Sequence, residues 1–268
     1  MSAIDITDRE FTLFQRFIFD VAGITLSASK KALVSGRLAK RLLYHQCDSY
    51  ADYFKLIESG RDAEELQLAV DLLTTNETYF FREKKHFDLL RQLAQGALPA
   101  SQPFRVWSAA CSTGEEVYSI AMVLADCLDG KPWEVLGSDL SARVLRSARA
   151  GHYSNQRTDQ IPQQYLRRFC LRGIGEQQGT LLIDRSLRQR VQFTQVNLNT
   201  ALPTLGPFDV IFLRNVMIYF SNDTKRQVIA RVLTQLKPGG HLFIGHSESL
   251  NDLSTEVSAL APSIYRKG

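Results

Sequence analysis

The spacing of hydrophobic residues divides the chain into two parts. In the first part, up to about residue 95, apolar side chains recur every three or four positions, as in amphipathic helices. Phe11, Phe14 and Ile18 set the first such stripe, and Gly23 follows it as a helix C-cap. We expect further helices from about residue 29 to 43 and at 50–58, 63–73 and 83–94.

Beyond residue 103, short apolar runs alternate with helical stretches. The stretch 95–103, QGALPASQP, separates the two patterns and is expected to be a linker. Alternation of this kind is typical of a doubly wound parallel sheet. The sequence therefore predicts an α/β domain over residues 96–268, preceded by an all-helical domain over residues 1–95. Its strands are expected at 104–109, 133–138, 191–196, 208–213 and 241–245, and its helices at 115–128, 141–150 and 222–236.

One segment interrupts this alternation. Residues 168–195 hold short β-prone runs separated by Gly173, Gly175 and Gly179. This pattern predicts a small antiparallel insertion in the α/β domain. The insertion and its approach are rich in arginine, but few aromatic residues lie between the arginines, so a nucleic-acid platform is not expected.

Composition and charge narrow the class of protein. A hydrophobic content of 44% is ample for a core, and a net charge of +4 is only mildly basic. The N-terminus, MSAIDITDRE, is too polar for a signal peptide, and no apolar run is long enough to span a membrane, so we expect a cytoplasmic protein. The four cysteines have no C-x-x-C spacing and no clustered histidines, so no metal site is expected.

The segment 105–118, RVWSAACSTGEEVY, has the pattern of a cofactor-binding strand–turn–helix junction. Small residues in its turn allow a ligand to approach the backbone, and the helix that starts near Glu115 presents free N–H groups there. The turn lacks the G-x-G-x-x-G pattern of dinucleotide binders, and Glu115 and Glu116 would repel a pyrophosphate. These features disfavour a nicotinamide dehydrogenase and favour a positively charged cofactor. S-adenosylmethionine, a sulfonium with an α-ammonium group, fits that description.

Polar residues follow the second and third predicted strands. Asp139 ends the second strand, where an acidic residue commonly binds ribose hydroxyls, although it could instead cap the next helix in competition with Ser141. Asn197 follows the third strand, and its amide suits an adenine edge, although an ordinary loop asparagine is an equal alternative.

The strand at 208–213 ends in Arg214 and Asn215, at the edge where open α/β sheets bind ligands. A buried strand rarely ends in this pair merely for solvation, so we expect both residues in the crevice. Tyr219 either points into the same crevice or begins the following helix.

Two segments of the helical part also stand out. Residues 74–82 run from polar to aromatic to basic, and they either line the cofactor crevice or cap the helix at 83–94 through Asn76 or Thr78. The second helix is basic on one side, with no acid between Ser27 and Cys47, which indicates either a solvated face or an acidic partner. The segment 245–248, GHSE, cannot form a hydrolase triad from adjacent residues, so we expect a structural or cofactor-side loop there.

Several of these segments together resemble the CheR family of chemotaxis receptor methyltransferases. Each motif is weak alone, but together and in this order they are highly specific, and they span nearly the whole chain. The motifs are NETYFFR at 76–82, STGEE at 112–116, Asp139, Asn197-Leu198, RNVMIYF at 214–220 and GHSE at 245–248.

The resemblance implies a Rossmann-like class I methyltransferase fold. It also implies a reaction in which a methyl group passes from S-adenosyl-L-methionine to glutamate side chains of chemoreceptors, giving γ-methyl esters and S-adenosyl-L-homocysteine. Glutamate is already ionised at neutral pH, so no general base is required. Arg82 and Tyr219 are the candidates for orienting the reacting carboxylate, and Glu116 is preferred over Glu115 by motif alignment alone. The implied cofactor contacts are Asn76, Thr78, Arg82, Glu116, Asp139, Asn197, Leu198, Arg214 and Asn215.

The resemblance also implies partners. Lys30, Arg37, Lys40 and Arg41 on the second helix would face the acidic methylation helices of the receptor. Arg172, Gly173, Gly175 and Gly179 would dock a receptor C-terminal peptide, unless the insertion is a plain glycine-rich hairpin. We expect a monomer that does not bind nucleic acid and does not insert directly into the membrane. The competing interpretations are a methyltransferase for another carboxylate and a receptor-binding module without turnover.

Overall fold

The structure is a computed structural model that describes residues 4–97, 102–128, 130–251 and 253–268. Its N-terminal domain packs four helices around a core of their own. The first begins at a capping box between Thr7 and Glu10 and ends at Gly23, whose positive φ of 71° closes the C-terminus. The four helices are α1 (Asp8–Ala22), α2 (Lys31–Tyr44), α3 (Tyr50–Glu58) and α4 (Ala63–Leu73).

The fifth helix, α5 (Lys85–Gly96), belongs to the sheet domain and not to the helical one. Its buried side chains Phe87, Leu90 and Ala94 join the core that also contains the α6 side chains. The domain boundary therefore falls near residue 75, and the predicted boundary at residue 95 is wrong. The predicted linker at 95–103 begins inside α5, and residues 98–101 lie outside the described part of the chain.

The second domain is built on one seven-stranded sheet with the order β6-β2-β1-β7-β8-β10-β9. Five strands are parallel, and β10 runs antiparallel to β8 and β9. The strand order reverses between β1 and β7, which is the switch point where such sheets bind ligands. The strands are β1 (Phe104–Ser108), β2 (Trp133–Asp139), β6 (Val191–Gln195), β7 (Phe208–Leu213), β8 (Leu236–Ile244), β9 (Val257–Ala261) and β10 (Ile264–Lys267).

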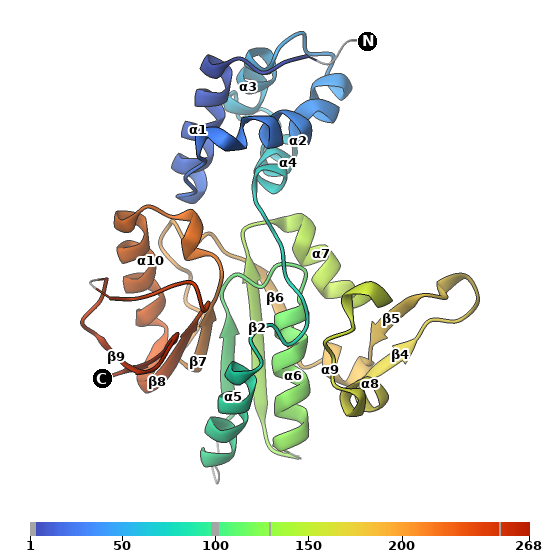
Figure 1. Ribbon diagram of the computed structural model, residues 1–268, viewed down its shortest axis with the longest axis vertical. Coiled ribbons are helices and arrows are strands. Elements are labelled where there is room, and N and C mark those ends of the chain that lie inside the picture. The colour runs from blue at the N-terminus through green and yellow to red at the C-terminus, as the bar shows by residue number, and fades with distance from the viewer. Residues whose placement is uncertain (1–3, 98–101, 129, 252) are drawn as a thin grey trace.

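Helices cover both faces of this sheet, which gives the doubly wound architecture predicted from the sequence (Figure 1). Successive residues of β1 point to opposite faces: Val106 joins the core beneath α5 and α6, and Trp107 joins the core beneath α10. The other sheet-domain helices are α6 (Glu115–Cys127), α7 (Ala142–Ala150) and α10 (Asn222–Thr234).

Two details differ from the predicted strands and helices. The helix expected at 222–236 ends at Thr234, because β8 begins at Leu236, five residues before the strand expected at 241–245. The hairpin of β9 and β10 was not predicted. Most of β9 is exposed, so it lacks the apolar run that marks a buried strand.

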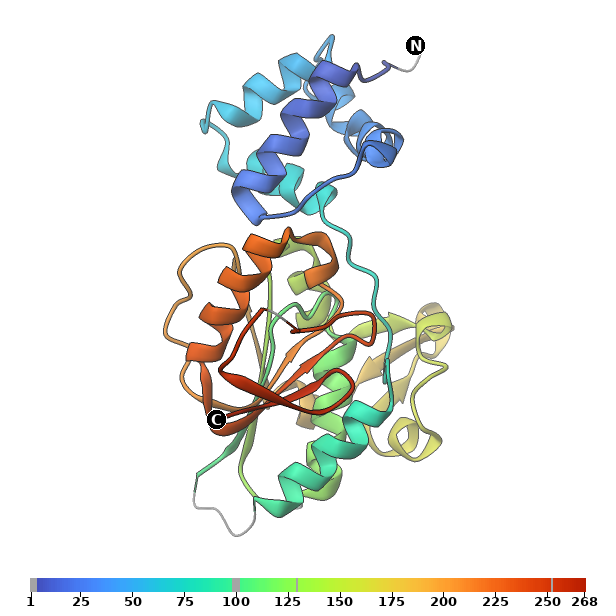
Figure 2. The ribbon, with the colours of Figure 1, turned by 60° about the vertical axis from the view of Figure 1, so that its left-hand side comes forward.

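A small antiparallel sheet of order β3-β5-β4 projects from the side of the molecule, as Figures 1 and 2 show. We call residues 152–188 the β subdomain. The predicted insertion at 168–195 begins too late, since β3 precedes it, and ends too late, since 191–195 form β6 of the main sheet. Its elements are β3 (His152–Ser154), α8 (Gln163–Phe169), β4 (Cys170–Arg172), β5 (Thr180–Ile183) and α9 (Arg185–Arg188).

The helical domain lies across the carboxyl end of the parallel strands (Figures 1 and 2). Several hydrogen bonds join the domains there. Among them, the Asn197 side-chain amide donates to the Val21 carbonyl at 2.7 Å, Thr25 N–H donates to the Tyr219 carbonyl at 2.8 Å, and Arg143 N–H donates to the Asp71 carboxylate at 3.0 Å. None of the helices in the described ranges has both the length and the apolar character that crossing a membrane requires.

Candidate active site

A cavity of about 370 Å³ lies between the helical domain and the carboxyl edge of the sheet. This size is typical of a small-molecule site. Its walls come from the loop after α1, the segment 73–78, and the ends of β1, β2, β6 and β7. The cavity brings together all the predicted cofactor residues and Tyr219: Asn76, Thr78, Arg82, Glu116, Asp139, Asn197, Leu198, Arg214, Asn215 and Tyr219.

The turn after β1 is shaped by packing as much as by any ligand. Gly114 has a φ of +94°, and a Cβ there would lie 2.9 Å from the Cβ of Ala148 on α7. Glycine is therefore required by backbone conformation and by close contact with α7. The side-chain hydroxyl of Ser112 donates to the Asn76 carbonyl at 2.8 Å, which joins the turn to the segment 74–82.

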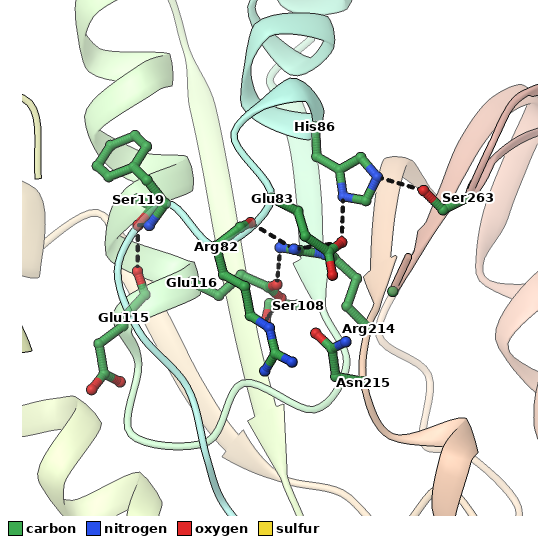
Figure 3. A network of polar contacts seen from close by, with 12 residues as sticks. Arg82, Glu83, His86, Ser108, Glu115, Glu116, Ser119, Arg214, Asn215 and Ser263 are labelled. Carbon is green, nitrogen blue, oxygen red and sulfur yellow. Dashed lines mark hydrogen bonds and ion pairs between the residues drawn. The ribbon is translucent and has the colours of Figure 1, made fainter. Parts of the chain in front are cut away.

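The two adjacent carboxylates of this turn face different surroundings (Figure 3). Glu116 accepts a hydrogen bond from the Ser108 hydroxyl at 2.7 Å and pairs with Arg214 at 2.8 Å, so it lies on the cavity side. Glu115 is fully buried and pairs with Arg157 at 2.8 Å. Burial raises the pKa of Glu115, while bonds from Thr113 and the charge of Arg157 oppose that rise. The expectation that both carboxylates repel an anion is therefore wrong, because each already has a cationic partner.

Arg214 is the centre of a buried ion-pair network. Its side chain is only 1% exposed and lies between Glu116 and Glu83, whose oxygens are 2.8 and 2.9 Å from the guanidinium. The guanidinium also donates to the Arg82 carbonyl at 2.6 Å. Arg214 thus joins the end of β7 to the start of α6 and to the segment that carries Arg82 (Figure 3).

A histidine extends this network toward the C-terminal strands. His86 is 1% exposed, pairs through Nε2 with the Ser263 hydroxyl at 2.9 Å, and places Nδ1 3.5 Å from Glu83. Burial, aided by the charge of Arg214, lowers the pKa of His86 to about 4. Burial raises the pKa of Glu83, but Arg214 and the His246 N–H lower it more, so the net shift is downward. At neutral pH the pair is therefore a neutral imidazole beside an ionised carboxylate.

Glu83, His86 and His246 are the one group in the described ranges whose donor atoms lie close enough to hold a metal ion, within 4.8 Å of one another. The Glu83 oxygen of this group lies 2.9 Å from the Arg214 guanidinium. Since a cation already occupies that position, the donor set does not fit a metal ion, and we interpret the group as part of the ion-pair network.

Asp139 and Asn197 line the cavity, but their side chains also have structural partners. Asp139 accepts backbone N–H bonds from Ser112 and Ser141, each at 2.9 Å. The alternative role considered for Asp139, that of N-cap of α7, is taken by Ser141. The Asn197 amide donates to Val21 and accepts from the Asn199 N–H at 2.9 Å, so it holds the two domains together besides facing the cavity.

Arg82 and Tyr219 are the two polar side chains expected to meet the substrate. Arg82 lines the cavity, donates to the Glu77 carbonyl at 3.3 Å and lies 5.5 Å from the Tyr79 ring. It has no ion-pair partner within the described ranges, unlike Arg214. Tyr219 is half-buried, and burial, aided by Glu77, raises the pKa of its hydroxyl, so the phenol keeps its proton at neutral pH.

The predicted basic face of α2 is only partly free. Arg41 pairs with the buried carboxylate of Glu65, and Arg37 donates to the carbonyls of Leu72 and Thr74 at 3.1 and 2.9 Å. Both guanidinium groups therefore stabilise the helical domain, and the sequence did not indicate that their partners lie on and just after α4. Lys30 and Lys40 remain exposed, and Lys30 lines the cavity mouth.

The predicted peptide-docking residues lie at the tip of the β subdomain, away from the cavity. Arg172 ends β4, which is an edge strand of the small sheet, and its side chain is exposed. Gly175 and Gly179 have φ values of +57° and +85° and shape the connection to β5. A Cβ on Gly173 would meet the Gln177 carbonyl oxygen at 1.9 Å, so this glycine is required by packing.

Among the charged residues around the site, Glu83, Arg157 and Glu248 were not predicted. Glu83 directly follows the NETYFFR motif, and Glu248 ends the GHSE motif, so their positions beside family motifs were an available signal. Arg157 gave no such signal. It lies beyond β3, where its guanidinium meets Glu115 and donates to the Thr78 carbonyl at 3.3 Å.

The fold and the site together define a class of enzyme. The strand order, with the antiparallel β10 between β8 and β9, is that of class I methyltransferases, and the cavity lies at the carboxyl edge of the sheet, at its switch point. The cavity is lined by the carboxylate of Asp139, the apolar side chain of Leu198 and the Glu116–Arg214 ion pair. These groups fit S-adenosyl-L-methionine.

Comparisons with known proteins support the same class of enzyme. The family models for the CheR methyltransferase all-alpha domain and the CheR methyltransferase SAM binding domain match residues 9–74 and 76–265. The chemotaxis protein methyltransferase of Escherichia coli (strain K12) is 40% identical over 263 residues, covering 97% of this chain and 91% of that protein. Chemotaxis protein methyltransferase 2 of Pseudomonas aeruginosa is 41% identical over 262 residues, covering 97% and 93%. The chain belongs to the CheR methyltransferase family.

Proposed function

We propose that the protein methylates glutamate side chains of chemoreceptors, giving γ-methyl esters and S-adenosyl-L-homocysteine. The observation that carries the proposal is the cavity at the switch point of the sheet, where residues of both domains and all the predicted cofactor positions meet. Family membership adds the chemotaxis setting. The substrate helices are cytoplasmic parts of membrane receptors, so the protein would act in the cytoplasm, and we propose that it does so as a monomer.

The chain's own residues account for binding and alignment. When bound, S-adenosyl-L-methionine supplies an electrophilic methyl group on a sulfonium. Asp139 would hold the ribose, Asn197 and Leu198 the base, and Glu116 with Arg214 the amino acid end. Arg82, which has no ion-pair partner in the described ranges, is available to orient a carboxylate at the cavity mouth.

The substrate carboxylate needs no general base, because it is ionised at neutral pH. The proposed work of the protein is therefore to align that carboxylate and exclude water from it. The Tyr219 hydroxyl, which keeps its proton, would donate a hydrogen bond to it. The helical domain, lying across the carboxyl edge of the sheet, would shield the cavity from solvent.

Transfer of labelled methyl groups into a receptor cytoplasmic fragment tests the function. We expect Arg82→Ala and Tyr219→Phe to lower kcat/KM for the fragment by about tenfold or more, as for loss of one hydrogen bond to a charged group. Calorimetry with S-adenosylhomocysteine separates a loss of cofactor binding from a loss of turnover. Label incorporation near the wild-type rate in both variants would refute the assigned roles, and none by the wild-type protein would refute the function.

We further propose that the β4 edge docks a receptor C-terminal peptide as an added strand. Leu171 and Ile174 are 52% and 82% exposed at this edge, and Arg172 lies between them. Two exposed apolar side chains beside a cation suit a peptide with apolar anchors and a C-terminal carboxylate. We expect calorimetry with the cognate peptide to give binding that Arg172→Glu weakens and Arg185→Glu, on α9, does not. No heat at high micromolar peptide would contradict the proposal.

A further inference from the structure

The segment 245–248, which follows β8, contacts the backbone of the loop that carries Arg214 and Asn215. One carboxylate oxygen of Glu248 accepts the N–H groups of Asn215 at 2.9 Å and Gly245 at 2.7 Å. The other oxygen accepts the N–H of Met217 at 2.8 Å. Glu248 does not line the cavity itself, so it acts on the cavity only through this loop.

The loop needs such a partner because it belongs to neither a strand nor a helix. β7 ends at Leu213, and the short 3-10 turn begins only at Met217, so the intervening N–H groups have no regular backbone partner. Asn215 also has a φ of +58°, a left-handed conformation that asparagine tolerates but that neighbouring contacts must maintain. The Glu248 carboxylate accepts the N–H of Asn215 itself and that of Met217, two residues further along the loop.

Close packing adds a second restraint. A Cβ on Gly245 would lie 2.4 Å from the Asn215 side-chain nitrogen and 2.9 Å from the Glu248 carboxylate, so the segment presses directly on the loop. The backbone N–H of His246 donates to Glu83 at 3.2 Å. The same four residues thus hold the loop after β7 and also contact the carboxylate that pairs with Arg214.

We propose that Glu248 is a positioning residue for methyl transfer. It fixes the backbone between Arg214 and Tyr219, and so sets where the cofactor-binding and substrate-binding side chains of that loop lie. A carboxylate suits this task because its three hydrogen bonds, from Asn215, Met217 and Gly245, all come from N–H donors. A glutamine would direct its own N–H groups at some of those donors. This inference rests on the proposed function for its link to turnover, but not for its link to cofactor binding.

The test compares Glu248→Gln, Glu248→Ala and the matched control Glu256→Gln in the full chain, Glu256 being exposed. Affinity for S-adenosylhomocysteine is measured by calorimetry, kcat and KM by methylation of a receptor fragment, and stability by thermal unfolding. We expect Glu248→Gln to weaken affinity by about tenfold and to lower kcat at saturating cofactor by a similar factor, as for loss of one charge-assisted hydrogen bond. The alanine variant should lose more, and the control should match the wild type.

Gly245→Ala is the second variant, since its Cβ would crowd the Asn215 side chain and the Glu248 carboxylate while the acid itself is retained. We expect it also to weaken cofactor affinity. Wild-type affinity and kcat in the folded fractions of both Glu248→Gln and Gly245→Ala, with only a lower melting temperature, would overturn the proposal and leave a purely structural role. If the wild-type protein fails to methylate any receptor fragment while the affinity losses persist, the proposed function fails and the positioning role stands.

Discussion

The role of a single residue in this site depends on which part of the protein its side chain meets. Glu115 and Glu116 are neighbours in sequence, yet one meets Arg157 inside the protein and the other meets Arg214 beside the cavity. Successive helix positions are turned by about 100° from each other, so adjacent side chains cannot share a face. The sequence therefore indicated that a carboxylate belongs at this turn, and motif alignment selected Glu116, but only the structure shows what separates the two residues.

His86 carries a prediction about pH and stability. Its pKa is about 4 in the folded protein and near 6.5 when unfolded, so the folded state prefers the neutral imidazole. Glu83, Arg214 and His246 face it, and Arg214 opposes protonation. The unfolded chain binds the extra proton first, so stability is full above about pH 6.5 and falls as the pH drops toward 4. Between pH 7 and 5 the loss from this residue is about 2 kcal/mol.

Urea unfolding of wild-type protein and His86→Gln at pH 7 and pH 5 measures this effect. Glutamine keeps a hydrogen-bonding group for Ser263 but does not titrate, so the variant should lose about 2 kcal/mol less than the wild type over this interval. His152→Gln, which removes an exposed histidine, should keep the wild-type difference. An equal pH dependence in His86→Gln and wild type would show that His86 does not contribute.

At the scale of elements, the spacing of apolar residues predicted those helices and strands that bury an apolar face. The helices of the first domain, the parallel strands and the polar residues at strand ends all followed from apolar spacing, because these elements bury one face or both. The bounds of the small sheet and the strand β9 could not be predicted in this way, because short exposed strands have no regular pattern of apolar residues. Helix α5 was placed correctly but assigned to the wrong domain, because an apolar face does not reveal what it packs against.

Helix α2 shows why a basic stripe is not by itself a docking surface. Arg41 pairs with Glu65, which is 3% exposed and also accepts from the Tyr53 hydroxyl at 2.6 Å. Burial raises the pKa of Glu65, but bonds from Arg41, Tyr53 and His45 outweigh it and lower the pKa to about 2. We expect Arg41→Glu to cost about 3 kcal/mol, because it leaves a buried carboxylate facing a second one.

Lys40→Glu provides the matched comparison for this helix. Lys40 is exposed and makes no ion pair with any residue in the described ranges, so its reversal should leave stability within about 0.5 kcal/mol of wild type. If α2 meets acidic receptor helices, Lys40→Glu should still lower receptor methylation while leaving S-adenosylhomocysteine affinity unchanged. Thermal unfolding, calorimetry and label transfer distinguish these outcomes. Unchanged methylation would remove Lys40 from the proposed contact.

At the scale of the whole molecule, the cavity exists only where the two domains meet. Sequence motifs placed polar residues at the sheet edge, but they did not reveal that Asn197 also bonds to Val21 or that Thr25 bonds to Tyr219. Contacts between residues 176 or more positions apart leave no local pattern in the sequence. Closure of the cavity is therefore a property of domain packing.

This closure gives the last prediction, which concerns Asn197→Ala. Loss of the bond to Val21 should loosen the segment 21–27, which lines the cavity, and weaken S-adenosylhomocysteine affinity by about tenfold. Hydrogen exchange should show faster amide exchange over this segment in the variant, and slower exchange there when the ligand binds the wild type. Peptides over α3, on the other side of the helical domain, should change little. Asn251→Ala, which removes an exposed asparagine outside the cavity, should match the wild type in both measurements. Weakened affinity without faster exchange at 21–27 would show that Asn197 acts on the ligand directly and not through the domain contact.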